Sequence, residues 1–312
     1  MTALICGSLA YDNIMLFDGH FKDHILPDKV HILNVSFLVP ELRREFGGCA
    51  GNIAYNLKLL GGEGHAMGTV GRDFDPYAEW MDQNLLSRDY VRWLPKEFTA
   101  QAYITTDRDD NQITAFHPGA MNHAHVSKVP VDAGITIGIV APDGRQGMVE
   151  HARQFADANI PFIFDPGQGL PMFNGEELIE FIELATWVAV NDYESQMLAN
   201  RTGLSPADIS RRVSALIVTR GAEGSIIYHD GKRTDIACVP AAELRDPTGC
   251  GDAYRAGLLY GLMNAYDWQT TGNIAALMGS IKIASNGTQN HSFTRDEFRA
   301  RFEGVFGYDY AA

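Results

Sequence analysis

Residues 245–257 read Arg-Asp-Pro-Thr-Gly-Cys-Gly-Asp-Ala-Tyr-Arg-Ala-Gly and lead directly into an apolar stretch. We expect a helix to begin at Gly249, Cys250 and Gly251, whose backbone N–H groups could then point at one anion with the helix dipole behind them. Asp252 falls in the first turn, where a carboxylate is stabilised in its charged form. Such an Asp fits phosphoryl transfer, because it can accept a hydroxyl proton while the amides hold the moving charge. The same pattern would also suit a helix that simply begins after a Pro turn.

Short apolar runs alternate with amphipathic stretches along the rest of the chain. The expected buried strands are residues 3–6, 65–70, 135–140, 162–165, 187–191 and 215–219. The expected helices are residues 51–60, 76–86, 146–158, 175–185, 192–201, 251–266 and 271–285. This alternation predicts an α/β fold with a mostly parallel sheet, in which ligands bind beyond the carboxyl ends of the strands.

Two regions break the alternation and predict a second, small sheet. The first covers about residues 14–46, with strand-like pieces at 14–17 and 30–37. The second, about 99–117, has two β-branched runs around a polar turn, which is a hairpin signal. A small sheet beside an α/β core could form a lid over a site. We therefore expect one domain over residues 1–312, with a lid made from these two inserted segments.

The composition excludes several classes of partner. The chain has 312 residues with 39 acidic and 25 basic side chains, so its formal net charge is −14. This balance argues against a binder of nucleic acid or of anionic membranes. No apolar stretch approaches the ~18 residues of a membrane span, and the first residues lack the basic region of a signal peptide. We expect a cytoplasmic protein.

Other motifs that carry chemistry are missing or weak. The four cysteines form no CxxC pair, and the chain has no Walker A, GxGxxG or GxSxG motif. P-loop, Rossmann and serine-hydrolase interpretations therefore lose support. His123-Ala-His125 could be a metal pair, but no third ligand lies nearby in the sequence, and a polar surface loop fits better.

The segment that ends at Asp252 resembles the second signature of the ribokinase-like (PfkB-type) carbohydrate and nucleoside kinases, roughly Asp-Thr-x-Gly-Ala-Gly-Asp. The resemblance implies a three-layer sandwich with a mostly parallel central sheet and a β-sheet lid. It also implies that Asp252 is the catalytic base and that Gly249, Cys250 and Gly251 form the anion hole. Pro247 and Cys250 depart from the commoner Thr and Ala, and we expect Cys250 to be inert.

A monovalent cation often lies near the anion hole in this family. The resemblance therefore makes Asp246 and Thr248 candidate ligands for an ion such as K⁺.

The segment Phe46-Gly-Gly-Cys-Ala-Gly-Asn52 resembles the first signature of the family, whose Gly-Gly…Asn unit holds the sugar. After the first expected strand, Asp12 stands where family members hold two sugar hydroxyls, and a carboxylate can accept two vicinal O–H groups. The implied substrate contacts are Ser8, Asp12, Ser36, Gly47, Gly48 and Asn52.

Three further segments match the nucleotide side of the family. Asn191-Asp-Tyr-Glu194 corresponds to its Asn-x-x-Glu motif, which organises Mg²⁺ largely through water, although a helix start would explain the same residues. Residues 217–224 resemble the nucleotide loop, and residues 285–289 correspond to the segment that flanks adenine. The implied contacts are Asn191, Glu194, Thr219, Arg220, Gly221, Gly224, Asn286 and Gly287.

Within the family the sequence is most similar to the bacterial adenosine kinases. In those proteins a lid aromatic stacks on the purine, which implies Phe116, with Tyr103 as a second candidate and Gln168 as a contact to the base or ribose. The implied function is transfer of the γ-phosphate of ATP, with Mg²⁺, to the 5′-hydroxyl of adenosine or a related nucleoside. A ribose- or fructose-type sugar kinase and a non-catalytic nucleoside sensor remain the alternatives. Exposed lid strands would favour a homodimer through the lid.

Overall fold

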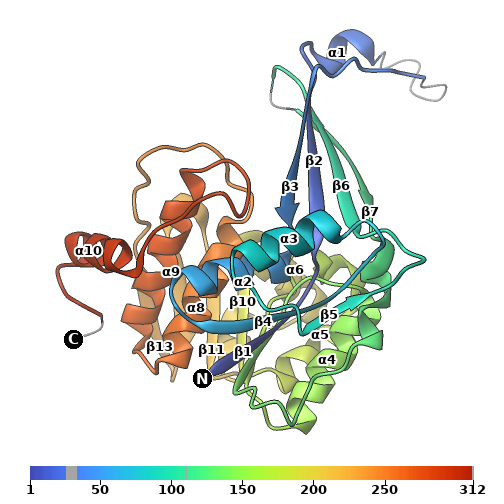
Figure 1. Ribbon diagram of the computed structural model, residues 1–312. Coiled ribbons are helices and arrows are strands. Elements are labelled where there is room, and N and C mark those ends of the chain that lie inside the picture. Colours follow the sequence, from blue (N-terminus) through green and yellow to red (C-terminus); the bar gives the residue numbers. More distant parts are fainter. Residues whose placement is uncertain (26–33, 110, 311–312) are drawn as a thin grey trace.

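The computed structural model describes residues 1–25, 34–109 and 111–310. Figure 1 shows a layered α/β body from which a narrow second sheet projects. The predicted fold class, a large and mostly parallel sheet with a separate small sheet, is confirmed. Among the described residues, none of the helices combines the length and the hydropathy that crossing a membrane would require.

The large sheet has the strand order β13-β12-β11-β10-β9-β8-β1-β4-β5. Its strands are β1 (Thr2–Cys6), β4 (Glu63–Val70), β5 (Tyr90–Trp93), β8 (Ile137–Val140), β9 (Phe162–Phe164), β10 (Trp187–Asn191), β11 (Ala215–Thr219), β12 (Ser225–His229) and β13 (Lys232–Ile236). All pairs from β11 to β5 are parallel, whereas β12 is antiparallel to both of its neighbours. The carboxyl ends of the parallel strands therefore meet at one edge of the sheet, where α/β proteins bind ligands.

Helices cover both faces of this sheet (Figure 1). The helices of the body are α2 (Cys49–Leu59), α3 (Asp75–Gln83), α4 (Arg145–Asp157), α5 (Gly175–Leu184), α6 (Asp192–Thr202), α7 (Pro206–Ser210), α8 (Cys250–Met263), α9 (Trp268–Ile283) and α10 (Arg295–Phe306). The short helix α1 (Phe21–His24) lies instead at the far end of the small sheet (Figure 1). Short 3₁₀ helices are η2 (Gly119–Val126), η3 (Gly167–Met172) and η4 (Gly221–Glu223).

Alternation along the buried strands explains the three layers. In β1, Ala3 and Ile5 enter a core cluster with α2, α3 and α8, whereas Leu4 and Cys6 enter a second cluster with α4, α5 and α6. Successive strand residues point to opposite faces, so a strand that is apolar throughout must be covered on both sides. A third cluster joins α8, α9 and α10.

The small sheet has the order β3-β2-β6-β7. Its strands are β2 (Ala10–Leu16), β3 (Glu41–Gly47), β6 (Ala100–Thr106) and β7 (Gln112–His117). The predicted hairpin near residues 99–117 is present as β6 and β7. The strand predicted at 30–37 is wrong where it can be judged, because residues 34–37 have no strand geometry and residues 30–33 lie outside the described residues. The strand that pairs with β2 is instead β3.

Register divides the small sheet into two faces. Asp12 on β2 pairs with Ala102 on β6, which pairs with Phe116 on β7. Tyr103 pairs with Asn13, one position further along both strands. Laterally paired residues share a face and successive residues alternate, so Asp12 and Phe116 lie on one face of the sheet and Tyr103 on the other.

Candidate active site

A pocket of about 310 Å³ opens beyond the carboxyl ends of β8, β9, β10 and β11, beside the amino end of α8. It is lined by Cys49, Pro142, Asp165, Gly167, Gln168, Asn191, Glu194, Thr219, Gly249, Gly251, Asp252 and Arg255. Residues predicted from four separate segments of the sequence thus meet in one place. The strand edge anticipated from the α/β pattern is the edge that carries the pocket.

The amino end of α8 has the form expected of an anion hole. Gly249 is the N-cap and adopts φ +78°, a left-handed conformation that glycine adopts readily. Gly249 and Gly251 line the pocket. Cys250 does not, and its N–H donates to the Pro247 carbonyl at 3.2 Å. Burial raises the pKa of the Cys250 thiol to about 11, which agrees with the expected inert role.

Asp252 is held by a short hydrogen bond inside the pocket. The Asn52 side-chain amide donates to its Oδ2 at 2.7 Å. Burial raises the pKa of Asp252 to about 7, and Asp165 also raises it, whereas Asn52 and Arg255 act in the opposite direction. A carboxylate that titrates near neutral pH suits a general base.

The orientation of Asn52 is fixed by a chain of side chains that sequence reasoning missed. The Trp80 indole N–H donates to Gln289 Oε1 at 2.9 Å, and Gln289 Nε2 donates to Asn52 Oδ1 at 3.0 Å. An indole nitrogen can only donate, so it sets the direction of both amides. Asn52 must therefore turn its NH₂ group toward Asp252. Nothing in the sequence pattern links Trp80 or Gln289 to residue 252.

Arg255 and Asp165 form a buried ion pair in the same pocket, with Arg255 donating to Asp165 at 3.0 Å. The Arg255 side chain is 5% exposed and the Asp165 side chain is 6% exposed. Sequence reasoning did not select either residue. A signal existed, since Arg255 lies three positions after Asp252 on one helix face, and Asp165 ends a predicted strand.

Asn191 and Glu194 begin α6 as a capping box. Glu194 N–H donates to Asn191 Oδ1, and Asn191 N–H donates to Glu194 Oε2, both at 2.7 Å. Burial raises the pKa of Glu194. The helix-start interpretation of this motif is thus correct, and both residues also line the pocket.

The donor set of the pocket fits Mg²⁺. The carboxyl groups of Asp165, Glu194 and Asp252 face one guanidinium, that of Arg255. An excess of acidic oxygen is the environment that a hard divalent cation prefers.

Asp246, one of the two predicted ligands of a monovalent cation, already makes several hydrogen bonds within the protein. The Asp246 carboxylate accepts the N–H groups of Thr248 and Gly287, each at 2.9 Å. The Asp246 carbonyl accepts from the Lys282 ammonium at 2.7 Å. The Lys282 ammonium thus already contacts Asp246, one of the two residues that the resemblance gives as ligands of a monovalent cation.

Asp12 lies at the base of the small sheet. Burial, with smaller contributions from Asp246 and Glu45, raises its pKa to about 6. These neighbours place Asp12 close to the loop before α8. The predicted hydroxyl-binding carboxylate therefore lies near that loop, although it is not part of the pocket lining.

The two glycines before α2 are required by close packing. A Cβ on Gly47 would lie 2.8 Å from Asp12 Oδ2, and a Cβ on Gly48 would lie 2.5 Å from the Ser8 carbonyl oxygen. Gly48 also has φ +86°. Ser8 Oγ accepts the Cys49 N–H at 3.1 Å, so its hydroxyl supports the start of α2.

Several predicted nucleotide contacts lie outside the pocket lining. Arg220 donates to the carboxylate and the carbonyl of Glu223, at 3.2 and 3.1 Å, and so stabilises its own turn. Gly221 and Gly224 are the positive-φ residues of that turn. Asn286 is exposed on the loop after α9.

The remaining predicted substrate contacts are divided among three places. Gln168 lines the pocket, whereas Ser36 is exposed in an irregular segment. Phe116 is 49% exposed on the Asp12 face of the small sheet. Tyr103 is 42% exposed on the other face and donates its hydroxyl to Gln101 at 2.8 Å.

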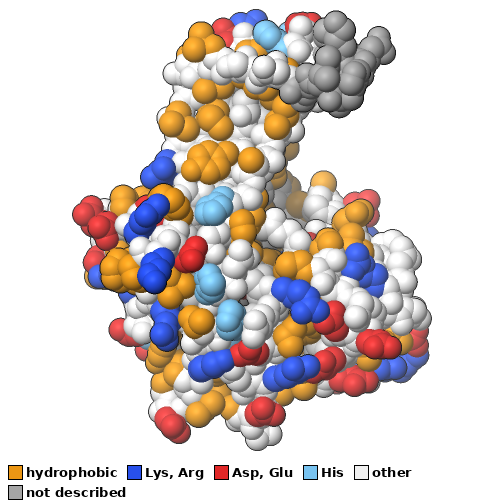
Figure 2. Space-filling view, turned by 90° about the vertical axis from the view of Figure 1, so that its right-hand side faces the viewer, with side chains coloured by type: hydrophobic (Ala, Val, Ile, Leu, Met, Phe, Trp, Pro, Cys, Tyr) orange, Lys and Arg blue, Asp and Glu red, His pale blue; other side chains and the backbone are white. Residues whose placement is uncertain are grey.

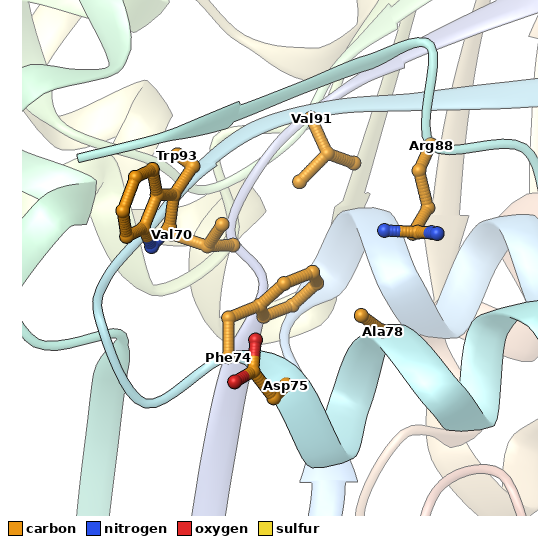
Figure 3. A pocket seen from close by; sticks show the side chains of 7 residues that line it. All are labelled: Val70, Phe74, Asp75, Ala78, Arg88, Val91 and Trp93. Carbon is orange, nitrogen blue, oxygen red and sulfur yellow. The ribbon is translucent and has the colours of Figure 1, made fainter. Parts of the chain in front are cut away.

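A second hollow of about 340 Å³ lies between α3 and β5 and contains none of the predicted site residues. Figure 3 shows Phe74 and Trp93 around it, with Arg88 at one side. Arg88 is already paired with Asp82 at 2.8 Å. His123 and His125 join no metal-like cluster among the described residues. They lie half-buried in the 3₁₀ helix η2, so the expectation of a surface loop is wrong at these positions.

Comparison with known protein families agrees with the resemblance found in the sequence. The model of the pfkB family of carbohydrate kinases matches residues 13–295. A nucleoside kinase from Methanocaldococcus jannaschii is 34% identical over 275 residues, which cover 86% of this chain and 89% of that protein.

Solved structures agree with this result. Burkholderia thailandensis nucleoside kinase in complex with inosine is 55% identical, with a TM-score of 0.90 and 99% of each chain covered. The same enzyme with ADP and inosine is 57% identical, with a TM-score of 0.88 over 99% of this chain and 97% of that one. Thermotoga maritima ribokinase is 17% identical, with a TM-score of 0.78 over 97% of this chain and 99% of that one. These matches confirm the ribokinase-like α/β fold.

Proposed function

This chain belongs to the pfkB family of carbohydrate kinases, and from that premise we propose that it transfers the γ-phosphate of ATP to the 5′-hydroxyl of adenosine or a related nucleoside. It is a phosphotransferase of the nucleoside kinase type. The observation that carries the proposal is Asp252, which is held at the amino end of α8 in one pocket with the strand-end residues.

Asp252 acts as the general base in this proposal. Asn52 holds its Oδ2, which leaves the other carboxylate oxygen to accept the proton of the 5′-hydroxyl. The hydroxyl oxygen attacks the γ-phosphorus, and the bond from that phosphorus to the β–γ bridging oxygen breaks, with ADP as the leaving group. The amides of Gly249 and Gly251 stabilise the charge on the transferring group, as preorganised donors do without reorganising.

Mg²⁺ would be held by Glu194 and Asn191, largely through water, on the acidic side of the pocket. When bound, the ion neutralises part of the phosphate charge. Glu194 keeps one oxygen on its capping hydrogen bond, so its second oxygen would be the one available to a hydrated ion. Thr219 lines the same side and would contact the phosphates.

The small sheet acts as the lid in this proposal. Asp12 accepts two ribose hydroxyls, and the ribose then lies between Asp12 and Asp252. Phe116 shares the face of Asp12 and is the aromatic that stacks on the base, whereas Tyr103 faces away. Because Asp12 titrates at about 6, its clamp is complete only above that pH.

Inosine is the second candidate acceptor, because the Burkholderia enzyme that resembles this chain over 99% of its length was solved with inosine. A sugar kinase has weaker support, since the matched fructokinase from Escherichia coli is 25% identical over 69% of this chain.

A substrate panel tests the function. Adenosine, inosine, cytidine, ribose and fructose are compared by kcat/KM with ATP and Mg²⁺, and we expect a purine nucleoside to rank first. A clear preference for ribose or fructose would refute the proposed acceptor. Nucleoside binding in calorimetry without any ADP formation would support a sensor instead.

We also propose that two copies associate through the lid. Hydrophobic side chains spread over the small sheet in Figure 2, and the exposed ones include Leu16, Leu42, Tyr103, Ile113 and Phe116. Among the described residues, β3 and β7 are the edge strands of this sheet, and a second sheet could pair with them. Light scattering that gives the mass of one chain at micromolar concentration would dismiss this proposal.

A further inference from the structure

Lys282 is fully buried near the end of α9, with 0% of its surface exposed. Lysine is almost never buried to this extent unless its ammonium group is paired. The Lys282 ammonium donates to the Asp246 carbonyl at 2.7 Å and to the Ser285 carbonyl at 3.3 Å. Two backbone carbonyls, rather than a carboxylate, thus hold the charge directly.

These carbonyls belong to two loops that adjoin the anion hole. Asp246 lies three residues before Gly249, and Ser285 begins the loop that leads to Gly287. The Asp246 carboxylate joins the same two loops, because it accepts the N–H groups of Thr248 and Gly287. Lys282 therefore connects α9 to both loops beside the anion hole. The positions of these loops determine where the backbone amides of the anion hole lie.

Backbone carbonyls that converge on one positive charge are also the ligands of K⁺ in proteins. In this chain an ammonium group already uses them. A second monovalent cation within about 4 Å would meet like-charge repulsion of about 4 kcal/mol at a surface-like dielectric. The acidic neighbours Asp246, Asp252 and Glu45 all attract the Lys282 charge, although burial lowers the pKa of the lysine.

We propose that Lys282 is a built-in replacement for the monovalent cation beside the anion hole, so that phosphoryl transfer in this enzyme does not depend on K⁺. Lys282 is a positioning residue, since it acts through the loops of Asp246 and Ser285 and does not touch the substrates. The proposal depends on the kinase site described above but not on which nucleoside is the acceptor.

The wild-type enzyme provides the first test. Its kcat/KM is measured in KCl, NaCl and choline chloride at equal ionic strength, with ATP, Mg²⁺ and the best nucleoside of the panel. We expect equal values in the three salts. Activation by K⁺ of about tenfold or more over choline would overturn the proposal.

Two variants provide the second test. Lys282→Ala removes the ammonium and leaves space for an ion, whereas Lys282→Met fills the space without charge. In choline chloride both variants should lose about 10- to 100-fold in kcat/KM, as expected for a lost electrostatic support. K⁺ or NH₄⁺ should restore much of the activity of Lys282→Ala and little of that of Lys282→Met. The matched control is Lys58→Ala, which removes an exposed lysine near the end of the otherwise buried helix α2 and should behave as the wild type.

Cation binding is also read without turnover. An ion that binds the folded state raises Tm, so K⁺ should raise the Tm of Lys282→Ala and not that of Lys282→Met. ADP binding to Lys282→Ala in calorimetry should tighten with K⁺. Folded Lys282→Ala that shows neither rescue nor a K⁺-dependent Tm would refute the proposal. The Tm and the ADP affinity can be measured even if the panel finds no nucleoside substrate. Failure of the proposed function can therefore be distinguished from failure of the proposal for Lys282.

Discussion

The amino end of α8 and the small sheet both carry predicted site residues, but they hold these residues in different ways. Around Asp252 the polar groups are buried and bonded, with Asn52 on the carboxylate and Arg255 paired with Asp165. On the small sheet the candidate aromatics remain largely exposed, as Phe116 shows at 49%. The proposed chemical centre is therefore preorganised inside the body, whereas the proposed recognition of the base would use an element whose side chains are still open to a ligand or another chain.

Substitutions at the amino end of α8 and on the small sheet should therefore have effects of different size. A change at the amino end of α8 alters charges in a dry environment, where electrostatic interactions are strong. A change on the small sheet removes contacts that form only with substrate.

The largest effect is expected for Asp252→Asn. An amide cannot accept the hydroxyl proton as a base, so kcat should fall by about 10²- to 10⁴-fold while nucleoside binding in calorimetry persists. In the wild type, kcat/KM should fall as the pH drops below about 7, because Asp252 becomes protonated.

The sign of the stability change provides a control. A carboxyl group whose pKa is raised on folding makes the folded state less stable as the pH rises from its ordinary value of 3.8 toward 7. Asp252→Asn should therefore have the higher Tm at pH 8. If this variant had the kcat of the wild type, Asp252 would not be the catalytic base.

Arg255→Met should combine a stability loss with a shifted pH profile. Removing the guanidinium leaves Asp165 buried without its partner, which costs about 3–5 kcal/mol of unfolding free energy. It also removes a charge that lowers the pKa of Asp252, so the acid limb of kcat/KM should move to higher pH.

The double variant Arg255→Met/Asp165→Asn separates these two effects. Asp165 and Arg255 act on Asp252 with opposite sign, so removing both should return the acid limb toward the wild-type position and restore part of the stability. An acid limb that stays unmoved in Arg255→Met would show that the ion pair does not tune the base.

Phe116→Ala tests the small sheet. Stacking of a base on an aromatic contributes about 1–3 kcal/mol, so kcat/KM for adenosine should fall by about 5- to 150-fold. Turnover of ribose, if any is detected, should not change. Tyr103→Ala should have a much smaller effect, because Tyr103 lies on the other face. Equal losses in the two variants would contradict the assignment of faces.

The smallest effect is expected for Cys250→Ala. The thiol titrates at about 11 and does not line the pocket. Kinetic constants should match the wild type, and treatment of the wild type with a thiol reagent at pH 7 should leave Cys250 unmodified in mass spectrometry. Modification with loss of activity would show that the thiol is accessible.

Much of the body was predictable, because its elements follow strong local patterns. Strands β10 and β11 match the predicted residues 187–191 and 215–219. The other predicted strands of the body agree within two residues. The weakly patterned elements were missed, including the edge strand β5, which is only partly buried, and α10, whose sequence is rich in charge.

The small sheet was predictable only in part. Its hairpin has a clear turn signal, but β3 is the polar run Glu-Leu-Arg-Arg-Glu-Phe-Gly, which has no strand-like alternation of buried positions. This segment becomes a strand because it pairs with β2 along seven residues. Pairing between distant segments is a tertiary contact that local propensity does not report.

Local sequence patterns were enough to predict the layers, the site edge and the pocket residues Asn191, Glu194, Thr219 and Asp252, although not Asp165 or Arg255. Buried strands must be apolar on both faces, and glycines at the helix starts must admit close approach of the backbone. Only the tertiary structure decided how those residues act. It turned Asn52 toward Asp252 through Trp80 and Gln289, and placed the ammonium of Lys282 on the Asp246 carbonyl. These interactions join residues far apart in the chain, and their strength comes from burial, which exists only once the chain is folded.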